Sequence, residues 1–235
     1  MVLALIRMRL SRLARNVVAK VTACIVVADR DKNVVKIYDS KTGDVKGTVQ
    51  PKKAFHLPSD MTTLPDGRLV LTDGNGLQLF DEEGVYLQPI TPDGVFSKCY
   101  GVASDGEGNI LTINTNPKGI PDCITRQGET DILRINFETN TILEKIELVD
   151  IINDNVRSRC RFLNCEGSNV YVFDLGLNRT YILDVERQQV KMVGSAGKNI
   201  GEFKDPAGIE VDSRGDMIIA GAGNNRLQVF DQFKN

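Results

Sequence analysis

The side chains that most often carry chemistry are scarce in this chain of 235 residues. It has a single histidine, His56, and five cysteines. Structural zinc sites combine cysteine and histidine at short, fixed spacings. The closest cysteines, Cys160 and Cys165, have neither a C-x-x-C partner nor a nearby histidine. We therefore expect no metal site and reduced thiols, which are typical of a cytoplasmic protein.

Hydrolytic catalysis has little support in the sequence. A Ser-His-Asp set would have to use His56, which lies just before an expected strand and is better explained as a structural residue. Calcium needs only oxygen ligands, so a calcium-dependent hydrolase is kept as the least favoured alternative. We expect no enzymatic activity and no cofactor.

A cluster of arginines is the most distinctive chemical feature. Arg157, Arg159 and Arg161 recur at every second position, so an extended backbone would point their guanidiniums the same way. Guanidiniums bind phosphate and carboxylate groups with paired hydrogen bonds, which suits a nucleic-acid backbone or an acidic peptide. The alternative is that these arginines pair with neighbouring acids such as Asp150 and Asp154.

These residues need a folded scaffold to position them, and the chain has the composition of an ordinary globular domain. It has 41% hydrophobic residues and a formal net charge of −2. This charge is too balanced to indicate a nucleic-acid or membrane partner, and no apolar run approaches a membrane span of about 18 residues. Residues 1–15, "MVLALIRMRLSRLAR", contain four arginines and no acid. We treat them as a non-homologous leader and assign residues 16–235 to one domain.

That domain repeats one pattern of about fourteen residues. Three copies align without a gap, one needs an extra residue, and the first has Ala23 where the others have glycine. The copies lie at residues 16–29, 60–73, 101–114, 160–174 and 208–221.

Each copy is typical of two β-strands joined by a tight turn. The turn carries Gly67, Gly108, Gly167 or Gly215, because tight turns favour the positive φ that glycine tolerates. Phrases such as "VVKIYD" and "RLQVFD" then predict a third strand. Fourth strands are predicted at 47–50, 86–90, 141–148 and 189–194. Four antiparallel strands per repeat predict an all-β fold, a β-propeller whose blades pack on their neighbours.

Aspartates close the second strand of several repeats. Asp29, Asp73 and Asp174 stand at this place, and Asn33 and Asn178 follow two of them by four residues. Short polar side chains of this kind cap backbone amides in turns. We interpret them as structural residues and not as metal ligands.

The last repeat resembles the NHL repeat. The resemblance rests on "F-x-x-P-x-G-I-x-V-D-x-x-G" at 203–215 and "N-R-L-Q-V-F" at 225–230. NHL propellers of the tripartite-motif (TRIM) type usually have six blades and form the C-terminal module of RING ubiquitin ligases. There they look like platforms for substrate recognition or RNA binding. The chain lacks a RING, a B-box and coiled-coil heptads, so the resemblance implies a recognition module without ligase activity of its own.

The sequence also departs from the NHL pattern. Gly221 stands where the motif prefers aspartate, only five repeats are legible, and the last ends after its third strand. We predict a truncated six-bladed propeller in preference to a genuine five-bladed one. An open ring would expose strand edges and apolar faces, which favours self-association. The long insertion in the third repeat suggests the muscle-associated branch of these ligases.

We expect partners to bind the face formed by the connections from second to third strand and from fourth to first strand. These connections carry a small positive excess, whereas the opposite turns are strongly acidic. The third repeat's connection, 115–130, is long enough to suggest a function. The candidate partner-binding residues are Lys52, Lys53, Phe55, Phe96, Tyr100, Lys118, Ile120, Arg126, Arg157, Arg159, Arg161, Arg179 and Arg226.

Protein recognition is the leading prediction, because the aromatic and aliphatic residues of this face could anchor a peptide or an adaptor protein. Single-stranded RNA is the alternative partner. RNA-binding NHL propellers resemble basic platforms, whereas this domain is acidic overall. No membrane partner is expected.

Overall fold

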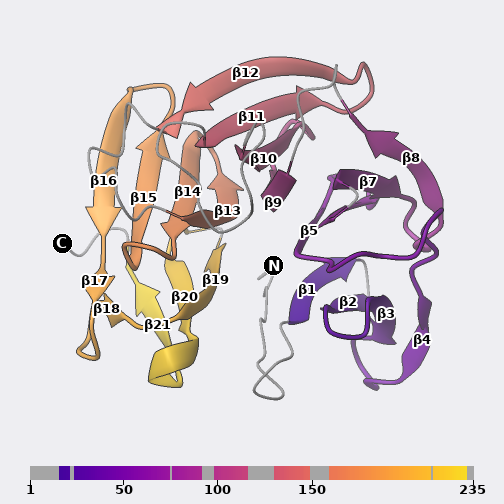
Figure 1. Ribbon diagram of the computed structural model, residues 1–235, viewed down its shortest axis with the longest axis horizontal. Helices are drawn as coiled ribbons and strands as arrows, with labels where there is room; N and C mark the ends of the chain where they lie inside the picture. The colour runs from indigo at the N-terminus through magenta and orange to yellow at the C-terminus, as the bar shows by residue number, and fades with distance from the viewer. Residues whose placement is uncertain are drawn as a thin grey trace.

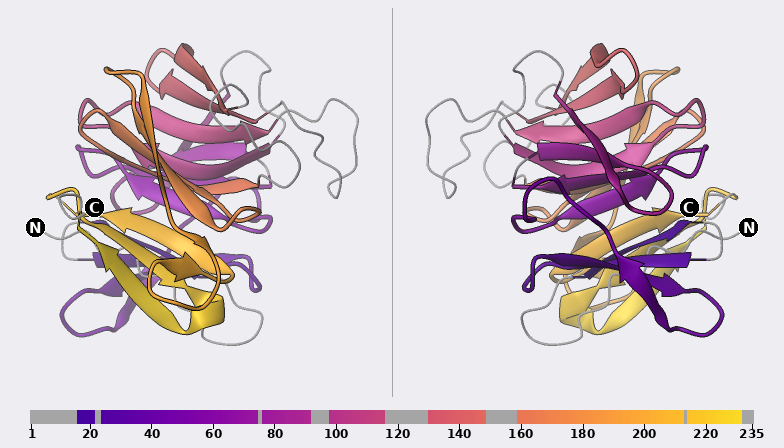
Figure 2. Two further views of the ribbon diagram at one scale, coloured as in Figure 1. Left: turned by 90° about the vertical axis from the view of Figure 1, so that its left-hand side faces the viewer. Right: turned by 90° about the vertical axis from the view of Figure 1, so that its right-hand side faces the viewer.

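A computed structural model describes residues 16–21, 24–74, 76–91, 98–115, 130–148, 159–212 and 214–231. Its strands form antiparallel sheets arranged around a common centre, as Figure 1 shows. Figure 2 shows the same blades edge-on from two sides. The predicted all-β propeller is therefore confirmed. No helix among these residues is long and apolar enough to cross a membrane.

Four blades have four strands in sequential order. The first comprises β1 (Asn16–Val21), β2 (Cys24–Asp29), β3 (Val34–Asp39) and β4 (Val45–Thr48). The second comprises β5 (Asp60–Thr63), β6 (Leu69–Asp73), β7 (Gly76–Phe80) and β8 (Tyr86–Ile90). The third comprises β9 (Lys98–Ser104), β10 (Ile110–Thr115), β11 (Thr130–Asn136) and β12 (Thr141–Glu147). The fourth comprises β13 (Cys160–Glu166), β14 (Asn169–Asp174), β15 (Arg179–Asp184) and β16 (Gln189–Val193).

The fifth blade has three strands within the described residues, β19 (Pro206–Val211), β20 (Met217–Gly221) and β21 (Arg226–Phe230). The third strand, β21, coincides with the phrase "RLQVF" that the sequence predicted as a strand. At Gly221, where the NHL motif prefers aspartate, the chain enters a short 3-10 turn, η2 (Ala222–Asn224). The connection from the fourth blade also forms a small parallel pair, β17 (Ser195–Ala196) with β18 (Glu202–Phe203).

The turn chemistry follows the sequence prediction. The glycines between first and second strands have positive φ, for example 92° at Gly67 and 83° at Gly215. Asp174 Oδ1 accepts hydrogen bonds from the backbone N–H groups of Gly176 (2.7 Å) and Leu177 (3.1 Å). Asn178 follows in the left-handed region with φ 52°. The aspartate caps are structural, as inferred.

Neighbouring blades are held together by hydrophobic clusters, which we call seams. The first seam joins the first and second blades around Val26, Val35 and Leu71, and the second joins the second and third blades around Leu79 and Ile110. The third seam joins the third and fourth blades and contains Leu163 and Val172. The fourth seam joins the fourth and fifth blades and contains Phe173 and Ile219. Each seam removes apolar side chains from water, which is the main stabilising contribution to such a fold.

The ring has no corresponding seam between the fifth and first blades among the described residues. On β21, Leu227 is 69% exposed and Val229 is 65% exposed. Their counterparts in the second blade, Leu77 and Leu79, are both 1% exposed, because the third blade covers them. The described ring is therefore open at this side. A sixth blade remains a prediction about a longer protein.

Candidate recognition face

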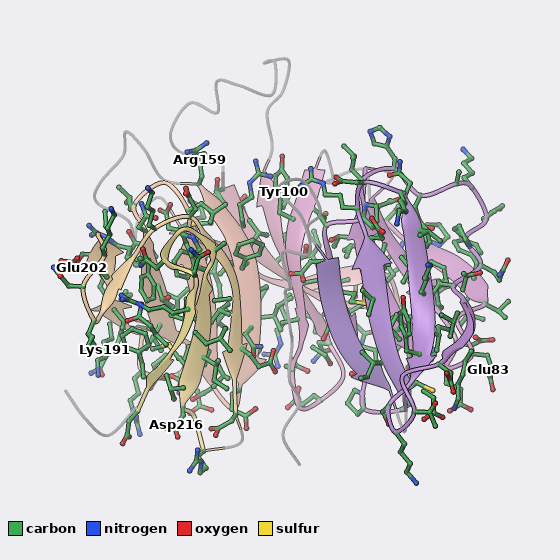
Figure 3. The ribbon with its side chains drawn as sticks, turned by 90° about the horizontal axis from the view of Figure 1, so that it is seen from below. Glu83, Tyr100, Arg159, Lys191, Glu202 and Asp216 are labelled. Atoms are coloured by element: carbon green, nitrogen blue, oxygen red, sulfur yellow. The ribbon has the colours of Figure 1, made fainter. Side chains whose placement is uncertain are left out.

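The two faces of the ring differ in chemistry. Figure 3 views the blades edge-on, with Tyr100 and Arg159 at one face and Glu83 and Asp216 at the other. We call the first the loop face, because it carries the connections from second to third and from fourth to first strands. We call the opposite one the turn face.

Acidic side chains of the turn face are largely committed to structure. The Oδ1 atom of Asp105 accepts hydrogen bonds from the backbone N–H groups of Glu107 (3.0 Å) and Asn109 (2.8 Å). Its Oδ2 atom accepts a hydrogen bond from Arg134 Nε at 2.8 Å. Burial raises the pKa of Asp105, but the hydrogen bonds from Asn109 and Arg134 outweigh it and hold the pKa below its ordinary value. Asp212 caps the equivalent turn of the fifth blade.

At the loop face, irregular pairing in the inner strands positions two candidate residues. The pairing of β9 with β10 shifts near Tyr100, and the pairing of β13 with β14 shifts at Arg161. Such bulges re-aim side chains at the ends of strands. The guanidinium carbon of Arg161 lies 3.4 Å from the centroid of the Tyr100 ring, so the two residues form a cation–π pair across the third seam.

The backbone around this pair is closely packed. Thr72 Oγ1 donates a hydrogen bond to the Tyr100 carbonyl at 3.0 Å. A Cβ at Gly101 would lie only 2.9 Å from the backbone nitrogen of Leu163, so the third and fourth blades approach closely there. Arg159 is exposed, and its backbone N–H donates to Asp174 Oδ1 at 2.8 Å. Tyr100, Arg159 and Arg161 are thus held in one region by a rigid scaffold.

The connection from β4 to β5 presents Lys52 and Lys53 to solvent. Phe55 behaves differently from the sequence prediction. It is 6% exposed and belongs to the first seam, with its ring centroid 6.0 Å from that of Phe80. An apolar residue in a connection looked like a surface anchor, but this one packs into the core and cannot contact a partner. The backbone N–H of His56 donates to Asp73 Oδ2 at 3.0 Å, which anchors the same connection.

Of the remaining predicted partner-binding residues, two lie in the described part of the chain and five lie outside it. Arg179 begins β15, with its Nη1 atom 3.8 Å from Met192 Sδ. Arg226 lies at the start of β21, and its guanidinium donates to the carbonyls of Lys198 (2.9 Å) and Asn199. Arg226 therefore supports a loop of its own chain. Phe96, Lys118, Ile120, Arg126 and Arg157 lie outside the described residues.

Sequence reasoning missed the loop that Arg226 supports. Residues 195–205 connect the fourth blade to the fifth, and they border a pocket of about 230 Å³ lined by Lys198, Lys204, Asn178 and Asp205 among others. Ile200 lies between the two lysines in sequence and is 95% exposed. The only signal in the sequence was an interrupted pattern with Gly194, Gly197 and Gly201 in place of a strand.

Among the described residues, no group of three or more His, Cys, Asp or Glu side chains is placed to hold a metal ion. The described residues of the loop face present cationic and aromatic side chains, Arg159, Arg161 and Tyr100 among them, on a rigid frame.

Comparison with known proteins supports the fold alone. No protein-family model and no curated protein sequence matches the chain. The WD40 β-propeller domain of Doa1 is similar, with a TM-score of 0.63 and 12% identity over 92% of this chain. Virginiamycin B lyase from Staphylococcus aureus (TM-score 0.60, 14% identity, 89% of this chain) and Kuenenia stuttgartiensis hydrazine synthase (0.59, 14%, 89%) are also similar. The chain spans 63%, 64% and 73% of these three structures, respectively.

Proposed function

We propose that this propeller is a non-catalytic recognition module that binds a protein partner on its loop face. The observation that supports this best is the Tyr100–Arg161 pair, with the exposed Arg159 two residues before Arg161 and at the same face as Tyr100 (Figure 3). Tyrosine and arginine are enriched among the residues that dominate binding energy at protein interfaces. An aromatic ring already stacked under a guanidinium loses little conformational entropy on binding, so it is pre-organised for contact.

The resemblance of residues 203–230 to the NHL repeat supports a more specific role. We propose that the propeller selects substrates for a TRIM-type ubiquitin ligase, whose catalytic RING domain would lie on other sequence. The acidic groups of the turn face are engaged in caps and ion pairs, as at Asp105 and Asp212. Among the described residues of the loop face, Lys52 and Lys53 are exposed cations that form no ion pair.

Quantitative affinity capture with purified variants tests the protein-recognition proposal. The test variant is Arg159→Ala/Arg161→Ala. The control is Arg187→Ala, which removes an exposed arginine from the turn following β15. We expect at least one partner to be lost selectively from the test variant and to bind the purified wild-type chain directly. If every captured protein is retained equally by both variants, the loop face is not the recognition surface.

Titration with single-stranded RNA at several salt concentrations tests the alternative. Because the loop face lacks a continuous basic platform among its described residues, we expect weak, sequence-independent binding at most. Tight RNA binding that falls steeply with salt and disappears in Arg159→Ala/Arg161→Ala would replace the protein-recognition proposal with RNA recognition.

A further inference from the structure

We propose that the pocket between the fourth and fifth blades, bordered by Lys198 and Lys204, binds an anionic side chain of a peptide, either a carboxylate or a phosphorylated hydroxyl. This inference rests on the proposed function and specifies which chemical feature of a protein partner is recognised. We call this site the 198/204 pocket. It is separate from the Tyr100–Arg161 pair, which lies on the inner strands.

The wall of the 198/204 pocket is the loop of residues 195–205, which side chains of the fifth blade hold by hydrogen bonds. Arg226 donates hydrogen bonds to the carbonyls of Lys198 and Asn199. Asn224 Nδ2 donates to the carbonyls of Gly197 (3.2 Å) and Glu202 (3.1 Å). The fifth blade therefore holds the loop by side-chain hydrogen bonds at several points along its length.

Further contacts close the loop. Gln228 Nε2 donates to the Glu202 carbonyl at 2.9 Å, while Gln228 Oε1 accepts from the Gly201 N–H at 2.9 Å. Phe203 lies beneath as part of the fourth seam, 1% exposed. A loop backbone held this firmly needs little ordering on binding, so only the two lysine side chains have to be fixed by the ligand.

The charges around the pocket favour an anion. Lys198 and Lys204 are both exposed, and neither forms an ion pair within the described part of the chain. The nearby carboxylate of Glu202 is already engaged, because its Oε2 atom accepts the Asn199 N–H at 2.8 Å. This hydrogen bond, together with the charge of Arg226, lowers the pKa of Glu202.

One acidic residue, Asp205, also borders the pocket. Its Oδ2 atom lies toward Gly223, 2.9 Å from where a Cβ on that glycine would stand. Among the lining residues, the two lysines outnumber the single acid, Asp205. An anionic group entering the pocket would gain charge-assisted hydrogen bonds that are stronger than those between neutral groups.

The size of the pocket limits the ligand. Its volume of about 230 Å³ is below the roughly 300–1,000 Å³ of sites for drug-sized molecules, so it suits one side chain and not a cofactor. Ile200 is 95% exposed in the same loop, outside the residues that line the pocket, and is available to an apolar side chain next to the bound anion. The ligand that fits both features is a peptide with an anionic residue next to an apolar one.

An NMR titration of the ¹⁵N-labelled chain tests the inference with three synthetic hexapeptides. The peptides share one sequence with a central leucine and differ only at the preceding residue, which is glutamate, phosphoserine or glutamine. We expect the two anionic peptides to shift the amide signals of residues 196–204, and the glutamine peptide to leave them unchanged. Binding of only one anionic peptide identifies whether the natural source is an acidic or a phosphorylated side chain.

Matched charge variants connect the signal to the pocket. Lys198→Gln/Lys204→Gln should raise the Kd for the anionic peptides at least about tenfold. Lys41→Gln/Lys191→Gln removes the same charge from the turn face and the outer strand β16 and should leave the Kd unchanged. If both double variants raise the Kd for the anionic peptides equally, the effect is general electrostatics and the pocket assignment is overturned. The absence of amide shifts at millimolar peptide concentration would also overturn it. A hexauridylate that displaces the peptide with higher affinity would assign the pocket to nucleic acid instead.

The two proposals can fail independently. If the peptides do not bind but partner capture still depends on Arg159 and Arg161, the 198/204 pocket is wrong and the recognition face stands. If the peptides bind at the pocket and no partner depends on the two arginines, the proposed use of the inner strands is wrong.

Discussion

The open side of the ring leads to a prediction about association of the 235-residue chain. Leu227 and Val229 stand at positions whose counterparts in the second blade, Leu77 and Leu79, are covered by the next blade. β21 also has no further strand on its outer side within the described residues. An uncovered apolar face beside a strand edge favours pairing with another chain. We expect the chain to self-associate through β21.

The magnitude follows from the exposed fractions. Complete burial of a leucine or valine side chain is worth about 1.5–3 kcal/mol. Since Leu227 is 69% and Val229 65% exposed, about two thirds of that remains to be gained at each residue. Together they contribute about 2–4 kcal/mol to association. Losing this contribution would weaken association by roughly 30- to 1,000-fold, because about 1.4 kcal/mol corresponds to a factor of ten.

Sedimentation velocity over a concentration series provides the assay. The variant Leu227→Thr/Val229→Thr places β-branched side chains at both positions of the edge strand and should remain folded. We expect it to stay monomeric where the wild type forms larger species. Leu87→Thr/Leu143→Thr is the control, because these residues are 46% and 53% exposed on the outer strands β8 and β12, away from the open side. A wild type that is monomeric throughout, or association that persists in the β21 variant, would refute the reasoning.

Three further predictions concern stability and reactivity. Gly101→Ala should destabilise the fold by about 1–3 kcal/mol in urea unfolding, because its Cβ would stand 2.9 Å from the Leu163 nitrogen; an unchanged midpoint would contradict the close approach. Arg134→Gln should cost about 1–2 kcal/mol at neutral pH. The pKa of Asp105 is lower in the folded protein than in the unfolded chain, so the stability that its ionised form contributes is present above the unfolded pKa of about 4 and is lost as the pH falls below it. The difference in unfolding free energy between Arg134→Gln and the wild type should therefore shrink toward pH 3. A difference that stays constant with pH would exclude this coupling. Burial raises the pKa of Cys99 to about 12, so thiol reagents at neutral pH should label it only as the protein unfolds; rapid labelling of the native chain would show that the thiol is accessible.

The blade architecture could be predicted from the sequence because it depends on local periodicity. The predicted fourth strand at 86–90 coincides with β8 (Tyr86–Ile90), and the run at 189–194 corresponds to β16 (Gln189–Val193). Positive φ at Gly67 was expected from turn geometry. These features are repeated, so each copy supported the interpretation of the others.

The site was less predictable because it depends on irregularities. Tyr100 and Arg161 approach each other through shifts in strand pairing, and the sequence alignment revealed only the shift in the fourth blade, as one extra residue. The equivalent shift in the third blade falls at Tyr100 and Gly101, at the very start of the gapless alignment. Phe55 was misjudged because hydrophobicity alone does not distinguish an anchor from a core residue. Lys198 and Lys204 were missed because their loop has no period, and their position depends on hydrogen bonds from a distant strand.

The order of the seams has a consequence for how the chain folds. Every seam joins blades that are neighbours in sequence, and no cluster among the described residues links the first blade to the fifth. Each blade can therefore dock on its predecessor as it leaves the ribosome, without waiting for the far end of the polypeptide. Denaturation is expected to begin at either terminal blade and to advance inward one unit at a time.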